Sequence, residues 1–136
     1  MSSSGNAPSR RDLAALQGVW KQVAFEENGV IEPPDTHGGN GALTTIRGHH
    51  FTVHATTGEL LLEGVFTLDA STTPRIMTWI DAMGSDKGKP LQAIYRLEGD
   101  HFVFNAADVG HPRPIEFKTG PGQTMRTFVR ASSSDR

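Results

Sequence analysis

Apolar and polar residues alternate with a two-residue period along most of this chain. The alternating runs are separated by Gly-, Pro- and Asn-containing turns about every 8 to 12 residues, a spacing typical of β-sandwiches and barrels. Nine such runs fit strands, at residues 18–27, 42–48, 49–56, 59–69, 75–81, 91–99, 101–106, 115–119 and 124–131. A short helix is predicted before them, at residues 10–16, where Ser9 and Asp12 resemble a capping box.

The turns between these strands predict an antiparallel meander. Asn28-Gly29, Thr57-Gly58 and Gly99-Asp100 are compact hairpin signals, because glycine reaches positive φ at little steric cost. A meander that closes on itself exposes no strand edges. The pattern therefore predicts an all-β fold, a single antiparallel β-barrel of about 8–10 strands with a short N-terminal helix.

Alternation also assigns strand residues to the two faces of the sheet. The residues expected to point into the barrel are Phe51, Val53, Leu60, Leu62, Phe66, Leu68, Leu91, Ala93, Tyr95, Leu97, Phe102 and Phe104. The strand at 75–81 leaves two alternatives open, since both of its faces carry large side chains. Either Ile76, Thr78 and Ile80 or Met77 and Trp79 point inward.

Composition and charge describe an ordinary globular chain and exclude several functions. Thirteen basic and 15 acidic residues give a net charge of −2, so no strong basic field is available to bind nucleic acid. The absence of cysteine excludes disulfides and thiolate chemistry. No apolar run is long enough for a signal peptide or a membrane span, which predicts a cytoplasmic protein with no membrane partner. The domain is assigned to residues 9–131, between disordered tails at 1–8 and 132–136.

Several segments together resemble an uncharacterised lipocalin-like domain family that is common in planctomycetes and found in other bacteria. They are DLAALQGVWKQVAFEENG (12–29), FTV (51–53), EGVFTLDASTTP (63–74), GKPLQAIYRLEGDHFVFN (88–105) and RPIEF (113–117). The resemblance implies a small lipocalin-like β-barrel and no particular reaction. Many members of that family are exported, whereas this chain shows no leader. The GVW stretch is similar to the lipocalin G-x-W signature, which implies that Trp20 packs against Arg130 of the last strand at one barrel end.

The segment GHHFTVHA (48–55) concentrates three histidines, which raises the question of a metal site. In a strand, His50 and His54 would lie roughly 13 Å apart, too far to share one ion, and His49 points to the opposite face. We therefore expect His50 and His54 to face solvent, and we predict no metal and no cofactor. His37 and His111 are placed in loops. HGGNG (37–41) is expected to be a mobile loop over one barrel end, or alternatively a lid.

The leading functional hypothesis is a barrel that binds one small apolar or amphipathic molecule in its interior. The candidate ligand-binding residues are Tyr95, Phe51, Phe66, Phe104, Thr78, Trp79 and Glu26. Tyr95 is the main polar candidate on an apolar face, although a buried tyrosine more often bonds within its own protein. Glu26 reaches the barrel mouth on the Trp20 face only if no bulge interrupts the first strand.

Two other hypotheses stay open. The barrel interior could be the active site of an enzyme of the isomerase or cyclase type, with Tyr95 and Glu26 as its first acid–base candidates. Alternatively, the interior could be filled by its own aromatics, which would make the chain a structural or partner-binding module. The sequence contains no G-x-S-x-G elbow and no phosphate-binding loop. A protein partner is left open and unspecified.

Overall fold

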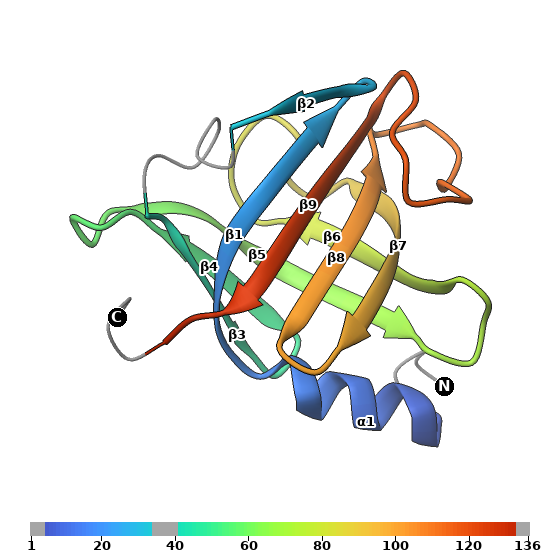
Figure 1. Cartoon of the computed structure of the whole chain (residues 1–136), viewed down its shortest axis with the longest axis horizontal. Helices are drawn as coiled ribbons and strands as arrows, with labels where there is room; N and C mark the ends of the chain where they lie inside the picture. The colour runs from blue at the N-terminus through green and yellow to red at the C-terminus, as the bar shows by residue number, and fades with distance from the viewer. Residues whose placement is uncertain (1–4, 34–40, 133–136) are drawn as a thin grey trace.

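Eight antiparallel strands close into a barrel in the computed structural model, and a short helix lies at one end (Figure 1). The structure describes residues 5–33 and 41–132. In chain order the elements are α1 (Ala7–Leu16), β1 (Gly18–Glu27), β2 (Val30–Glu32), β3 (Leu43–Arg47), β4 (His50–His54), β5 (Leu60–Asp69), β6 (Arg75–Asp81), β7 (Pro90–Glu98), β8 (His101–Ala107) and β9 (Gln123–Arg130). The predicted all-β barrel with an N-terminal helix is confirmed.

Some predictions fall on residues that the structure does not describe. These are the outermost parts of the two predicted tails, residues 1–4 and 133–136, and the segment 34–40 with His37 and most of the HGGNG loop. The lid alternative therefore lies outside the described residues.

The barrel closes because β1 pairs with both ends of the meander. Consecutive strands pair in the order β3-β4-β5-β6-β7-β8-β9, while β1 pairs with β3 on one side and with β9 on the other. Trp20 lies opposite Arg130 in the β1–β9 ladder and opposite Thr44 in the β1–β3 ladder. The short strand β2 extends the sheet beyond the barrel by pairing with residues 25–27.

The prediction of a strand at residues 115–119 is wrong. β8 pairs directly with β7 and β9, so no edge remains for the segment to join. It packs instead against the outside of the barrel, where Asn105 Nδ2 donates to the carbonyl oxygens of Glu116 (3.0 Å) and Lys118 (3.3 Å). Ile115, at the start of its alternating pattern, is 83% exposed. The sequence analysis also missed β2, which is too short to show a period.

The helix begins three residues earlier than predicted and is capped by a different residue. Asn6 Oδ1 accepts from the backbone N–H of Ser9 at 2.9 Å, so Asn6 is the N-cap and the capping box at Ser9 is wrong. Ser9 is buried, and its hydroxyl oxygen accepts from the N–H of Ala70 in the β5–β6 turn at 2.9 Å. Residues 7 and 8, assigned to the disordered tail, thus belong to a helix tied to the barrel.

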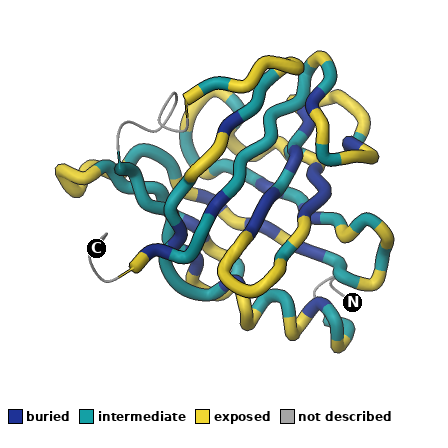
Figure 2. Tube along the Cα trace, viewed as in Figure 1, coloured by how far each residue is buried: buried dark blue, intermediate teal, exposed yellow. Residues whose placement is uncertain are grey.

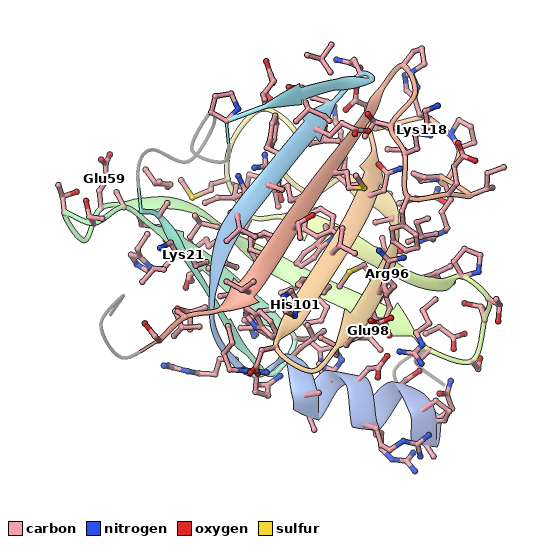
Figure 3. All side chains as sticks on the ribbon, in the orientation of Figure 1. Lys21, Glu59, Arg96, Glu98, His101 and Lys118 are labelled. Carbon is pink, nitrogen blue, oxygen red and sulfur yellow. The ribbon has the colours of Figure 1, made fainter. Side chains whose placement is uncertain are left out.

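Buried and exposed residues alternate along most strands, and this pattern decides which face of residues 75–81 points inward (Figure 2). On β6, Met77 and Trp79 are buried in the core, so the second alternative for this strand is the correct one. On β7 and β8, Arg96, Glu98 and His101 are exposed on the outer surface (Figure 3).

Trp20 and Arg130 pack together at the barrel end beside the helix. The Arg130 guanidinium carbon lies 4.3 Å from the indole centroid. Its two terminal nitrogens donate to the carbonyl oxygens of Gln17 (2.9 Å) and Ala15 (2.7 Å), while Trp20 Nε1 donates to the Leu16 carbonyl at 2.8 Å. The cation–π contact and these bonds attach the C-terminal turn of α1 to the barrel.

Candidate functional site

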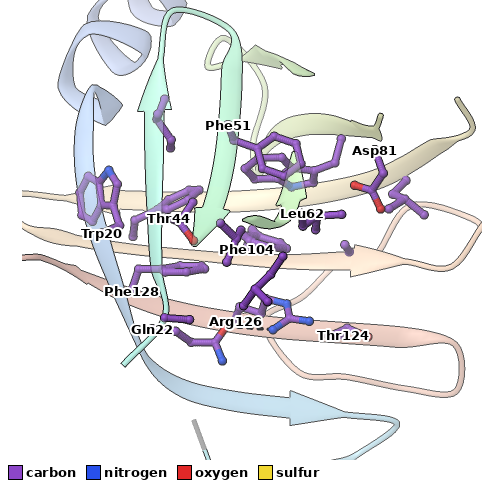
Figure 4. A pocket seen from close by; sticks show the side chains of 18 of the residues that line it. Trp20, Gln22, Thr44, Phe51, Leu62, Asp81, Phe104, Thr124, Arg126 and Phe128 are labelled. Carbon is purple, nitrogen blue, oxygen red and sulfur yellow. Dashed lines mark hydrogen bonds between the residues drawn. The ribbon is translucent and has the colours of Figure 1, made fainter. Parts of the chain in front are cut away.

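The barrel encloses a cavity of about 650 Å³. Its lining begins at Trp20, next to α1, and continues to Asp81, Asp86 and Asp108 at the opposite ends of the strands. Figure 4 shows Trp20, Phe128, Arg126 and Thr124 in succession along this axis. The cavity therefore ends at Trp20 on the side of α1, and its other end, called the open end below, is lined by acidic residues.

The deep part of the cavity has aromatic walls. Trp79 lies between Phe51, at 5.1 Å in an edge-to-face arrangement, and Phe104, at 4.9 Å between ring centroids. Phe128 on β9 stacks against Phe102 and Phe104 of the neighbouring strand β8, with ring centroids 5.7 and 5.9 Å apart. Such tilted and offset ring contacts are the favourable ones for aromatic pairs. Three of the predicted ligand-binding residues, Phe51, Trp79 and Phe104, line this cavity.

Polar groups lie between the aromatic part and the open end. Arg126, on the inner face of β9, donates from Nη1 to Gln22 Oε1 at 2.9 Å (Figure 4), and its guanidinium carbon lies 4.7 Å from the Phe25 ring centroid. Burial lowers the pKa of Arg126, and the negative charges of Glu27 and Asp81 partly oppose that shift. The cavity thus contains a positive charge on a half-buried side chain.

Asp81, at the end of β6, faces the same cavity. Burial raises the pKa of its carboxyl group, and repulsion from Asp86 raises it further, while Arg126 lowers it. An aspartate in this setting accepts a proton at higher pH than an exposed one. The open end of the cavity therefore carries a carboxyl group that is more easily neutralised than an ordinary surface aspartate.

Glu26 does not line the cavity, because a bulge interrupts β1. The β1–β9 register shifts between Gln22 and Ala24, so the alternation of the second half of β1 changes phase. The Glu26 carboxylate accepts from the N–H of Thr119 (2.7 Å) and from its hydroxyl group. These two bonds, the hydroxyl first, lower the pKa of Glu26 against the opposing effect of burial. The prediction that Glu26 faces the barrel interior required a regular β1 strand, and the bulge makes it wrong. Glu26 instead binds Thr119, outside the cavity lining.

Tyr95 lies on the inner face of β7 as predicted, but at the helix end and outside the cavity lining. Its hydroxyl group donates to Asp12 Oδ2 at 2.6 Å, and Arg75 Nη1 donates to the same oxygen at 3.2 Å. Burial, followed by the bond to Asp12, raises the pKa of Tyr95. The interpretation of Tyr95 as a core residue with a partner inside the protein is confirmed.

Phe66 and Thr78 also lie outside the cavity lining. Phe66 is buried behind Trp79, with ring centroids 5.2 Å apart, and so supports the wall without forming it. Thr78 is on the outer face of β6, where its hydroxyl oxygen accepts from Arg113 Nη2 at 3.3 Å. Its placement follows from the inward orientation of Met77 and Trp79.

The three histidines at positions 49, 50 and 54 are not part of any metal-binding group among the described residues. His50 is exposed and His54 is half-buried, while the His49 ring lies 5.8 Å from that of Phe66. Within residues 5–33 and 41–132, no group of three or more His, Asp or Glu side chains is arranged to hold a metal ion. In the same ranges, no helix has the length and apolar character needed to cross a membrane.

The sequence analysis missed Arg126, Gln22 and Asp81 as cavity residues. Each was available from alternation: Arg126 precedes Phe128 by two positions, Gln22 follows Trp20 by two, and Asp81 follows Trp79 by two. A polar residue two positions from a core aromatic residue points to the same face of the strand, and this spacing indicates a polar group inside the barrel.

Comparison of the chain with protein-family models, with curated proteins and with solved structures gave no match. The resemblance to the lipocalin-like family of planctomycetes therefore stays a prediction, and the function has to be argued from the cavity.

Proposed function

We propose that this chain is a lipocalin-like barrel that binds one small apolar or amphipathic molecule in its interior. The observation that carries the proposal is the cavity of about 650 Å³. Ligand pockets measure roughly 300–1,000 Å³ and combine apolar walls with a few polar groups. The aromatic walls formed by Phe51, Trp79 and Phe104, together with Arg126 and Asp81, have this composition.

The cavity also weighs against the two alternatives. A packed structural module would fill its interior with its own aromatic side chains, whereas this barrel leaves space beside them. For the enzyme hypothesis, the first acid–base candidates were Tyr95 and Glu26. Both are hydrogen-bonded within the protein and lie outside the cavity lining.

Filling the cavity tests the proposal. Ala106 lines the cavity from β8, so Ala106→Phe adds a ring inside the barrel. Thr67→Phe adds the same ring at an exposed position on β5 and is the matched control. The neutral fluorescent probe N-phenyl-1-naphthylamine should bind the wild-type protein and Thr67→Phe at one saturable site. Its affinity for Ala106→Phe should be at least about tenfold weaker.

Two results would contradict the proposal: no saturable binding of the probe to the wild-type protein, or equal affinity for Ala106→Phe and the wild type. Circular dichroism and thermal unfolding of each variant establish that the barrel is intact. Native mass spectrometry of the recombinant protein adds an independent measurement, because a bound cellular molecule would appear as a mass increment that Ala106→Phe lacks.

A further inference from the structure

We propose that the ligand is an anionic amphiphile whose carboxylate binds Arg126, with its apolar chain between the aromatic rings of the deep cavity. This inference rests on the proposed function and names the chemical class of the ligand. It follows from the position of one guanidinium group, from the partners of that group, and from the order of apolar and polar residues along the cavity.

The hydrogen-bonding capacity of Arg126 is only partly used. A guanidinium group has five N–H donors, and Arg126 donates to Gln22 Oε1 through Nη1. Two other arginines of the barrel form ion pairs, Arg75 with Asp12 (3.2 Å) and Arg130 with Asp100 (3.1 Å). Among the described residues, no carboxylate lies within ion-pair distance of Arg126.

The guanidinium group of Arg126 is also fixed in position. Gln22 binds one edge, and the Phe25 ring lies against its face at 4.7 Å. A planar guanidinium held in this way can bind both oxygens of a carboxylate. Because the Arg126 side chain is half-buried in the cavity wall, an anion bound there would compensate for the contact with water that the guanidinium group has lost.

The order of the side chains matches an amphiphile. Along β9, Arg126 lies between Phe128, which belongs to the aromatic part, and Thr124 toward the open end (Figure 4). A ligand with its carboxylate on Arg126 therefore has apolar walls on the side of Trp20. A small anion without an apolar chain would contact Arg126 but leave the aromatic walls unoccupied, so the order of residues favours an amphiphile.

The acidic residues near Arg126 offer a competing class, a cationic amphiphile. The charged groups around it are Asp81 on β6, Asp86 and Asp108 at the open end, and Glu27 and Lys21 on β1. We favour the anion because Arg126 lies within β9, two residues from Phe128 and beside the aromatic walls, whereas the acidic residues lie at or beyond the strand ends. The test therefore includes an amine, and tighter binding of the amine would contradict the proposal.

Three ligands of equal chain length provide the test: decanoate, decan-1-ol and decylamine. Calorimetric titration of the wild-type protein at pH 7.5 should give decanoate about ten- to hundredfold higher affinity than decan-1-ol, the range expected for a charge-assisted hydrogen-bonded pair. Arg126→Gln should remove this preference while leaving the affinity for decan-1-ol within about twofold. Arg126→Lys, which keeps the charge but not the two-pronged geometry, should retain part of it.

Arg96→Gln is the matched control. Arg96 also lies 4.7 Å from a phenylalanine ring, that of Phe117, but on the outer surface of β7, so its loss should leave the preference for decanoate intact. Equal binding of decanoate and decan-1-ol, or tighter binding of decylamine, by the wild-type protein would overturn the inference while leaving the interior binding site standing. Failure of all three ligands to bind would count against the proposed function itself. The wild-type comparison requires no variant and holds even if Arg126→Gln does not fold.

Discussion

Replacing Tyr95 with Phe removes one hydroxyl group and leaves the packing of the ring in place. That hydroxyl donates to Asp12 Oδ2 at 2.6 Å, and the Asp12 side chain is 16% exposed. A hydrogen bond to a charged group contributes about 1.5–3 kcal/mol to stability. Because Asp12 keeps its ion pair with Arg75, we expect Tyr95→Phe to lower the free energy of unfolding by about 1–2 kcal/mol.

Urea unfolding at pH 7, followed by tryptophan fluorescence, measures this loss. A double-mutant cycle with Asp12→Ala assigns it to the pair, since Tyr95→Phe should cost less than about 0.5 kcal/mol once the acceptor is gone. In thermal unfolding, each kcal/mol corresponds to roughly 3–5 °C for a chain of this size.

The same hydroxyl group predicts a pH dependence. Burial and the bond to Asp12 raise the pKa of Tyr95 in the folded protein above its unfolded value of about 10. The folded state therefore holds this proton more tightly, and the contribution is complete below about pH 10 and decreases as the pH rises further. Above that pH, the wild-type protein should lose stability more steeply than Tyr95→Phe.

Probe binding to Tyr95→Phe tests whether Tyr95 attaches α1 to the barrel or contacts a ligand. Binding of N-phenyl-1-naphthylamine should be unaffected by Tyr95→Phe, because Tyr95 lies outside the cavity lining. Weaker probe binding together with a stability change below about 0.3 kcal/mol would identify Tyr95 as a ligand contact instead.

Two further predictions concern the cavity wall and its charge. Gly64→Ala should lower the free energy of unfolding by about 1–3 kcal/mol in urea, because the new Cβ would meet the Ile80 carbonyl oxygen and lie 2.8 Å from Phe51 Cε1; unchanged stability would mean that β5 and β6 can separate at no cost. Decanesulfonate, which stays ionised, should bind more tightly at pH 4 than at pH 7, because burial raises the pKa of Asp81 above the ordinary aspartate value and its negative charge is lost as the pH falls. Calorimetry should show a flatter dependence in Asp81→Asn, and an equally steep one would exclude Asp81 as the cause.

The barrel could be predicted from the sequence because most strands present one apolar and one polar face. β1 was predicted with its observed bounds, and the inward residues of β7 and β8 followed from alternation. The pattern was ambiguous on β6, where Ile76 and Ile80 make the outer face as apolar as the inner one. Residues 115–119 also alternate, and only the direct pairing of β8 with β9 shows that no place exists for a strand there.

The candidate site was predicted in part, for two physical reasons. Its aromatic walls follow from alternation, but the bulge in β1 leaves no mark in the sequence and changes the face of Glu26. The partner of Tyr95, Asp12, lies 83 residues away, and no local pattern encodes that contact. Arg126 was accessible to the same alternation argument and was overlooked because a charge inside a barrel is uncommon.

The helix attached across one end of the barrel has a consequence for the traffic of ligands. Its C-terminal turn is bound to Arg130, Asp12 is bound to Tyr95 and Arg75, and Ser9 is bound to the β5–β6 turn. In the binding mode proposed above, a ligand would therefore enter and leave past the acidic residues at the other end of the cavity. An amphiphile bound through Arg126, as proposed, would enter with its apolar chain first and leave with its headgroup first. The rate of exchange should accordingly depend on the loops at that opening and be insensitive to changes in α1 that leave the barrel folded.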